Sequence, residues 1–196
     1  YNDDRTSYEC VPCYNSVDEY IASAKEDLES YKADLEEALE ETLLVARRDK
    51  AQSALFYMAI DNLPYITANA GIVGADNVVI ALAKLLEGSF PVALLARFSD
   101  NVFSVILQDC NVEDAKKRAE SVCQAVYERL FDIPNGKTIQ TSLSIGVAMI
   151  GETAPDVPEL LTRAVNASAK VKMDTKGAGN GINVYNPAEN AAANDS

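Results

Sequence analysis

Two short apolar runs separated by a polar turn stand near the middle of the chain. Residues 91–96 and 102–107 are mostly apolar, and the polar residues Ser99, Asp100 and Asn101 lie between them. Runs of this length and composition are typical of buried strands, and short polar side chains favour tight turns. The pattern predicts a β-hairpin with an exposed polar tip, where rigid strands often carry functional residues.

A long helical pattern precedes this hairpin, from residue 17 to about residue 48. Apolar residues recur every seven positions at Ile21, Leu28 and Leu35, and mostly charged residues fill the other faces. This spacing is typical of a helix that packs along one stripe. Two interpretations stay open: the acidic helix packs on its own domain, or it forms a coiled-coil stalk that pairs with another subunit.

The remaining elements alternate between strand and helix patterns. An apolar run at 54–60 predicts a strand, and a pattern that alternates and then becomes wholly apolar at 138–150 predicts a long strand. Helical spacing of apolar residues predicts helices over 66–71, 75–86, 112–130 and 158–172, and a short strand is expected over 182–185. The order predicts an α/β (α+β) fold, in which a βαββαβ core forms a mostly antiparallel sheet flanked by helices, with the acidic helix added at its N-terminal side.

The chain divides into three predicted parts. Residues 1–50 are expected to hold a linker and the N-terminal helix, and residues 51–186 the globular domain. Residues 187–196 are rich in Ala and Asn without an apolar pattern, which predicts a disordered linker to a further domain that is absent here.

Charge and residue types exclude several functions. The chain has 17 Lys+Arg against 30 Asp+Glu and a net charge of -13, so it should repel nucleic acids and anionic membrane surfaces. No apolar run approaches the roughly 20 residues of a membrane span, and we expect no membrane insertion. The sequence has no histidine, which removes the commonest general base and metal ligand.

Two of the four cysteines, Cys10 and Cys13, form a C-x-x-C motif. Such a motif can be half of a zinc site or a redox pair. No second pair has ligand spacing, so a structural or incidental role with reduced thiols is favoured, although the role of Cys10 and Cys13 stays open.

Four stretches together resemble the GGDEF domain of the diguanylate cyclases. Arg97-Phe-Ser-Asp-Asn-Val-Phe103 stands where the family has R-Y-G-G-D/E-E-F, and Ser142-Leu-Ser-Ile-Gly-Val-Ala148 is similar to its T-V-S-I-G-V-A strand. Ile60-Asp61 opens a stretch that reaches Asp76 with the spacing of D-x-D-x-F-K-x-I-N-D-x-x-G-H-x-x-G-D, and Lys176-Gly-Ala-Gly179 matches K-x-x-G. The resemblance covers about residues 53–187 and implies a GGDEF, nucleotidyl-cyclase-like fold.

The resemblance also implies where the chemistry of the family should lie. Active members condense two GTP molecules into cyclic di-GMP by phosphoryl transfer with two Mg²⁺ ions held by carboxylates. The ligand positions correspond to Ala59 and Asn101, and the second signature acid to Val102. The two signature glycines correspond to Ser99 and Asp100, while the final aromatic residue is kept as Phe103. These departures predict a degenerate domain without metal or cofactor that is not an enzyme.

A vestigial nucleotide pocket follows from the same comparison of residues. The resemblance places it at the Ile60 carbonyl, at Thr67 in place of a guanine-reading Asn, at Asp76 and at the phosphate-contacting Lys176. Asp76 can also be a carboxylate that stabilises a helix N-terminus, and Lys176 a solvated loop lysine, so GTP binding without turnover is an alternative function. The family's inhibitory R-x-x-D corresponds to Phe90 and Ala93, which predicts that this site is lost.

The departures look most like the GGDEF domains of FimX-type pilus regulators. That likeness implies a cytoplasmic bacterial protein in which this domain has a regulatory, interaction or dimerisation role. It further implies an adjacent EAL domain, an upstream sensory domain, a possible homodimer, and partners in the type IV pilus machinery that drives twitching motility.

Overall fold

The computed structural model describes residues 17–90 and 93–187, with side chains described from residue 33 onward. The predictions for Cys10, Cys13 and most of the linker 187–196 therefore lie outside the described residues. The main elements in chain order are α1 (Val17–Asp49), β1 (Ser53–Ile60), α2 (Leu63–Ser89), β2 (Leu94–Ser99), β3 (Val102–Leu107), α3 (Val112–Glu128), β4 (Leu130–Ile133), β5 (Lys137–Gln140), β6 (Leu143–Ile150), α4 (Val157–Asp174) and β7 (Gly181–Val184).

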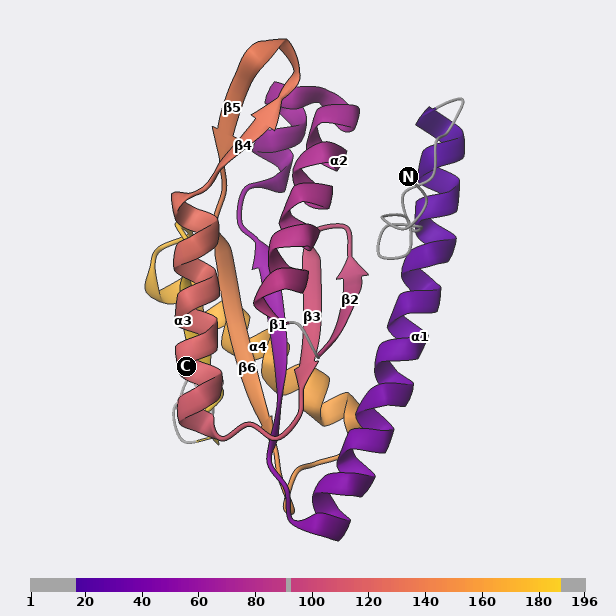
Figure 1. The fold of residues 1–196 in the computed structure, drawn as a ribbon, viewed down its shortest axis with the longest axis vertical. Coiled ribbons are helices and arrows are strands. Elements are labelled where there is room, and N and C mark those ends of the chain that lie inside the picture. Colours follow the sequence, from indigo (N-terminus) through magenta and orange to yellow (C-terminus); the bar gives the residue numbers. More distant parts are fainter. Residues whose placement is uncertain (1–16, 91–92, 188–196) are drawn as a thin grey trace.

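A five-stranded sheet in the order β2-β3-β1-β6-β7 forms the centre of the domain (Figure 1). β1 lies between β3 and β6 and is antiparallel to both, β2 is antiparallel to β3, and β7 is parallel to β6. The parallel pair requires a crossover, and α4 provides it. The mostly antiparallel sheet with flanking helices confirms the predicted α/β (α+β) class.

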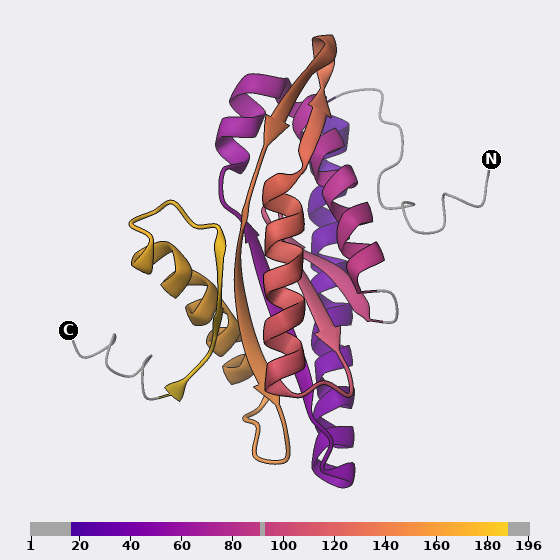
Figure 2. The same cartoon turned by 60° about the vertical axis from the view of Figure 1, so that its left-hand side comes forward.

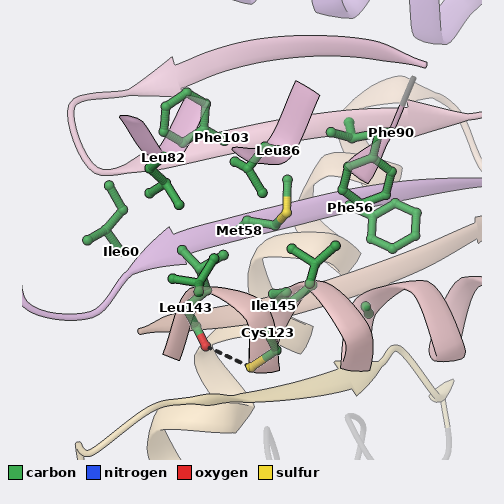
Figure 3. Packing of buried hydrophobic residues seen from close by; sticks show 14 of the residues in the cluster. Phe56, Met58, Ile60, Leu82, Leu86, Phe90, Phe103, Cys123, Leu143 and Ile145 are labelled. Atoms are coloured by element: carbon green, nitrogen blue, oxygen red, sulfur yellow. Dashed lines mark hydrogen bonds between the residues drawn. The ribbon is translucent and has the colours of Figure 1, made fainter. Parts of the chain in front are cut away.

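The two faces of the sheet carry separate layers of core residues. Along β1, Phe56, Met58 and Ile60 point into a cluster with α2 and α3 (Figure 3), whereas Leu55 and Tyr57 point toward α1 and α4. Side chains alternate between the faces of a strand, so a strand covered on both faces is apolar throughout. The near-continuous apolar sequence of β1 therefore reflects its central place, with α2 and α3 on one face and α4 on the other (Figures 1 and 2).

The described half of α1 packs on its own domain. Leu35, Leu39, Leu43 and Ala46 are at most 2% exposed and belong to the cluster on the α4 side of the sheet. Their spacing of three or four residues places them on one helix face. This half of the helix follows the first of the two interpretations. The boundaries predicted at residues 50 and 186 stay predictions.

The region predicted as two helices, 66–71 and 75–86, is one helical element with an internal break. Gly71 interrupts α2 with φ 75° and ψ 175°, a conformation that glycine adopts at little cost. By length and composition alone, α2 is the one helix within the described residues that could cross a membrane. Its inward side nevertheless supplies Ile66, Val78, Leu82 and other residues to the core.

A short hairpin that the sequence did not predict projects beyond one end of the sheet (Figures 1 and 2). The predicted strand 138–150 divides into β5 and β6, and β5 pairs with β4 around the turn at Pro134–Gly136. The predicted helix 112–130 accordingly ends at Glu128, because Arg129 adopts an extended backbone with φ -82° and ψ 138°. Leu130 continues the apolar spacing of α3 but is 62% exposed in β4.

Candidate functional site

The predicted hairpin tip forms between β2 and β3. Arg97 Nη2 donates a hydrogen bond to the Asp100 carbonyl oxygen at 2.8 Å, and Ser99 Oγ donates to Asn101 Oδ1 at 3.2 Å. The strand pairing shifts between Arg97 and Ser99, and such a bulge turns the strand locally. Asp100 and Asn101 are exposed, so the tip presents polar groups outward on a fixed backbone.

The end of β1 lies directly beside this tip. The Ile60 amide donates to the Asn101 carbonyl oxygen at 2.7 Å, and Ala59 pairs across the strands with Val102. Val102 is 2% exposed, and directly paired residues of neighbouring strands have their side chains on the same face. The structure thus brings together the positions singled out in the sequence, and two of them form an apolar contact pair at the strand end.

Asp61, the residue after β1, is enclosed by hydrogen-bond donors. Its side chain is 4% exposed, and its two carboxylate oxygens accept bonds from Ser142 Oγ at 2.6 Å and from Ser144 Oγ. The Asn180 amide donates to Oδ2 at 2.9 Å. Bonds to a buried carboxylate are strong because they replace its lost hydration. Asp61 therefore fastens the loop after α4 to the ends of β1 and β6.

Lys172 is the cation that the structure places at the end of β1, and the sequence reasoning missed it. Its Nζ lies 3.8 Å from Asp61 Oδ1 and 3.5 Å from the Asp61 carbonyl oxygen. Lys176, which the motif favoured, is exposed in the loop with φ 55°. Lys172 lies in the last turn of the predicted helix 158–172, where a basic residue is favourable, and this position could have pointed to it.

The other predicted pocket residues lie on both sides of the break in α2. Thr67 Oγ1 donates to the Leu63 carbonyl oxygen at 3.0 Å, which commits the hydroxyl to its own helix. Asp76 lies after Gly71 and is half-buried. The break separates the helical turn that carries Thr67 from the turn that carries Asp76, so the helix geometry at Gly71 fixes how these two side chains are arranged.

Phe90, at the first inhibitory position, is a core residue. It is 2% exposed, and its ring packs edge-on against Phe56 with centroids 5.1 Å apart (Figure 3). The Arg118 guanidinium lies 5.8 Å from the centre of the Phe90 ring and donates to the Ser89 carbonyl oxygen at 2.6 Å. Ala93 is partly buried against the same core. An aromatic side chain turned inward offers no charge to a ligand at this position.

Cys123 lies beneath the Asp61 loop and is 7% exposed. Its Sγ is within 3.6 Å of the Leu143 carbonyl oxygen and 3.5 Å of Asn180 Oδ1 (Figure 3). Burial, and then the negative charge of Asp61, raises the pKa of the thiol to about 11. Since the thiolate is the reactive form, this cysteine is held neutral at physiological pH.

Among the side chains that the structure describes, residues 33–90 and 93–187, no group of three or more Cys, Asp or Glu is arranged to hold a metal ion. The polar chemistry at the end of β1 comes instead from Asp61, Lys172 and the two serines of β6, together with backbone groups of Ile60 and Asn101. This arrangement can position the loop after α4, and it places the Lys172 ammonium beside Asp61.

Comparison with known proteins identifies the family. The model of the "Diguanylate cyclase, GGDEF domain" family matches residues 31–178, and the chain therefore belongs to the GGDEF family. The structure is similar to the crystal structure of the FimX GGDEF domain from Pseudomonas aeruginosa, with a TM-score of 0.70 and 25% identity over 78% of this chain and 91% of that one. This likeness confirms the predicted GGDEF fold.

Two curated relatives are named as enzymes. The chain is 26% identical to the probable diguanylate cyclase DgcE of Escherichia coli over 162 residues, which are 82% of this chain and 14% of DgcE. It is 27% identical to the diguanylate cyclase TpbB of Pseudomonas aeruginosa over 148 residues, 74% of this chain and 34% of TpbB. The chain thus spans well under half the length of either relative.

These names correct the prediction that the domain is not an enzyme. Both relatives are named cyclases, and the matching family model is that of a cyclase domain. The expectation rested on residue types: Ala59, Asn101 and Val102 in place of acidic residues, and Ser99 and Asp100 in place of the signature glycines. A prediction of 'not an enzyme' therefore conflicts with the family to which the chain belongs, and these residue types do not by themselves show inactivity.

Proposed function

We propose that this GGDEF domain acts as a regulatory, interaction or dimerisation module within a larger cytoplasmic cyclic di-GMP signalling protein. We further propose that this protein controls type IV pilus assembly and twitching motility. The partners under this proposal are an adjacent EAL domain, an upstream sensory domain and proteins of the pilus machinery. The likeness to the FimX GGDEF domain supports the pilus role.

The packing of α1 against β2 is the observation that carries the regulatory role. Buried residues of α1 share one cluster with Ala96 of β2, and Phe98 packs against the same cluster. Phe98 directly precedes the exposed tip. Packed interiors transmit displacement because they contain little free volume. A shift of α1 would therefore move the strand that leads to the tip.

A domain exchange tests this function. Pseudomonas aeruginosa FimX with its GGDEF domain replaced by this chain should restore twitching to a strain that lacks FimX, measured as the diameter of the twitching zone. Leu39→Asp, in the buried stripe of α1, should abolish the restoration, while Leu44→Asp, 66% exposed on the same helix, should not. A hybrid that accumulates normally but leaves the strain without twitching overturns the pilus role.

A second candidate function is GTP binding that regulates the partner domains. It is favoured by Asp76 after the break in α2 and by the Lys172 ammonium near the end of β1. Calorimetry with GTP and Mg²⁺ should show binding that Asp76→Ala weakens by about tenfold, roughly 1.4 kcal/mol. Asp132→Ala, an exposed carboxylate of β4, is the matched control. Chromatography of the same samples for cyclic di-GMP reports turnover directly.

A further inference from the structure

A groove with apolar walls and an acidic rim lies between α1 and α4, beside the end of β2. Its volume is about 380 Å³. Phe98, Leu161 and Val165 contribute apolar surface, and Glu36 and Glu40 line the groove from α1. A volume of this size lies within the range of small ligand and anchor-residue sites. The groove is therefore large enough to receive several side chains of another molecule.

The apolar part of the groove is held in place by the core. The Phe98 ring packs edge-on against Tyr57 with centroids 5.6 Å apart, and the fully buried Leu39 and Leu160 belong to the cluster that Phe98 and Leu161 pack against. Val165 remains 36% exposed on α4. A preformed apolar surface loses little conformational entropy when a partner covers it.

The charges around the groove select the kind of partner. Its described lining includes the two glutamates and no cation, and the chain as a whole carries a net charge of -13. Arg163 is the basic residue of α4 nearest in sequence to the groove lining. Its Nε lies 3.6 Å from Glu159 Oε1, and its guanidinium carbon lies 5.1 Å from the centre of the Tyr185 ring. A basic partner would be attracted and an acidic one repelled.

We propose that this groove docks an amphipathic helix of a partner protein, with apolar residues at i and i+4 flanked by Lys or Arg. A helix can lie between α1 and α4 with its apolar face inward, while its cations meet Glu36 and Glu40. This docking rests on the interaction function proposed above and specifies the surface and the chemistry of the partner. Because Phe98 precedes the signature tip, the bound helix would contact the strand that carries it.

Fluorescence anisotropy with synthetic helices tests the groove. The probe is a labelled peptide of about 15 residues made of Lys and Leu with leucines at i and i+4, and the control peptide has Ser in place of Leu. Val165→Glu should weaken binding of the leucine peptide by about tenfold. Val112→Glu is the matched variant, because Val112 is 41% exposed on α3, which packs on the other face of the sheet; it should leave the affinity within about twofold.

Two further measurements test the charges of the groove and the self-association of the chain. Glu36→Lys with Glu40→Lys should weaken binding and reduce its salt dependence. Equal binding of the Ser peptide, or equal weakening by Val112→Glu, overturns the proposal. A concentration-dependent mass that Val165→Glu abolishes would make a second copy the occupant, which also overturns it.

The twitching experiment separates this proposal from the proposed function. If the FimX hybrid does not restore twitching but the peptides bind as expected, the pilus function is wrong and docking in the groove is supported. If a hybrid that carries Val165→Glu restores twitching normally, docking in the groove is wrong and the pilus function is supported.

Discussion

At the residue scale, the buried carboxylate of Asp61 determines the local geometry at the end of β1. Two hydroxyls and one amide donate to it, and the Lys172 ammonium lies nearby. The loop that supplies the amide also contains Gly179, which has φ +72°. Without a side chain, Gly179 approaches the Asp61 carboxylate so closely that an added Cβ would overlap it. The glycine of the K-x-x-G match is thus required for contact with Asp61.

Substitution of Gly179 tests this contact. Gly179→Ala should lower the free energy of unfolding by about 3 kcal/mol or more, because left-handed backbone strain of roughly 1–2 kcal/mol adds to displacement of a buried carboxylate. Gly177→Ala is the matched control, since Gly177 has φ +92° but nothing within 4 Å of an added Cβ, and should cost only the backbone strain. Urea denaturation gives both values. Equal losses would contradict the proposed role of the Asp61 contact.

The raised pKa of Cys123 predicts a pH effect on stability. The thiol ionises near pH 9.0 ordinarily and near about 11 in the fold. Its contribution is fully present below pH 9 and is lost as the pH rises through 11, because the unfolded chain releases the proton first. Over this pH range the unsubstituted protein should lose up to about 2 kcal/mol more of its free energy of unfolding than the Cys123→Ala variant loses. Urea denaturation of both proteins across the range measures the difference, and parallel curves would contradict it.

Sequence reasoning identified the site region but not the contacts within it. The motif spacing selected Lys176, whereas Lys172, one helical turn earlier, lies beside Asp61. Either lysine could lie near the end of a helix. Which of the two side chains reaches the end of β1 depends on where α4 ends. The burial of Asp61 could not be predicted either, since its donors come from Ser142, Ser144 and Asn180, which are distant in sequence.

At the element scale, the close approach of α4 to β6 explains a glycine in the middle of a buried strand. An added Cβ at Gly146 would overlap the Ala164 carbonyl oxygen and the Ser168 amide of α4. Ser168 Oγ also donates to the Ser144 carbonyl oxygen at 2.8 Å. The helix backbone therefore lies directly on the strand backbone at this point.

Gly146→Ala should consequently destabilise the domain by about 3 kcal/mol or prevent folding, because two backbones must separate to admit a methyl group. Gly151→Ala, just after β6 and with nothing within 4 Å, is the control and should change stability by less than about 0.5 kcal/mol. Soluble yield and thermal unfolding report the outcome. A stable Gly146→Ala variant would show that α4 can shift away from β6 at small cost.

Element types were predicted better than element boundaries. Short apolar runs correctly indicated β1 and β3, and helical spacing of apolar residues correctly indicated α3 and α4. The hairpin β4–β5 was missed because Leu130 continues the apolar spacing of α3, and the continuity of α2 was missed because Gly71 is a usual helix end. Both differences depend on pairing and packing with other parts of the chain.

At the scale of the whole molecule, the part of α1 from residue 33 onward packs as part of the domain. Its described half closes the sheet face that α4 leaves uncovered near β2 (Figure 1). The sequence left packing and stalk interpretations open because a seven-residue apolar repeat suits both. Because one stripe of apolar residues is buried in the described half of α1, this half packs on its own domain.

Paired leucine substitutions in α1 test whether the helix and the sheet unfold together. Leu39 is fully buried, whereas Leu44 on the same helix is 66% exposed. Leu39→Ala should lower the free energy of unfolding by about 2–4 kcal/mol because it leaves a cavity, and Leu44→Ala by less than about 0.5 kcal/mol. Since helix propensity changes equally in both variants, the difference isolates packing. Urea denaturation followed by circular dichroism should show one transition, shifted as a whole by Leu39→Ala; small and equal losses would mean that α1 is dispensable for the core.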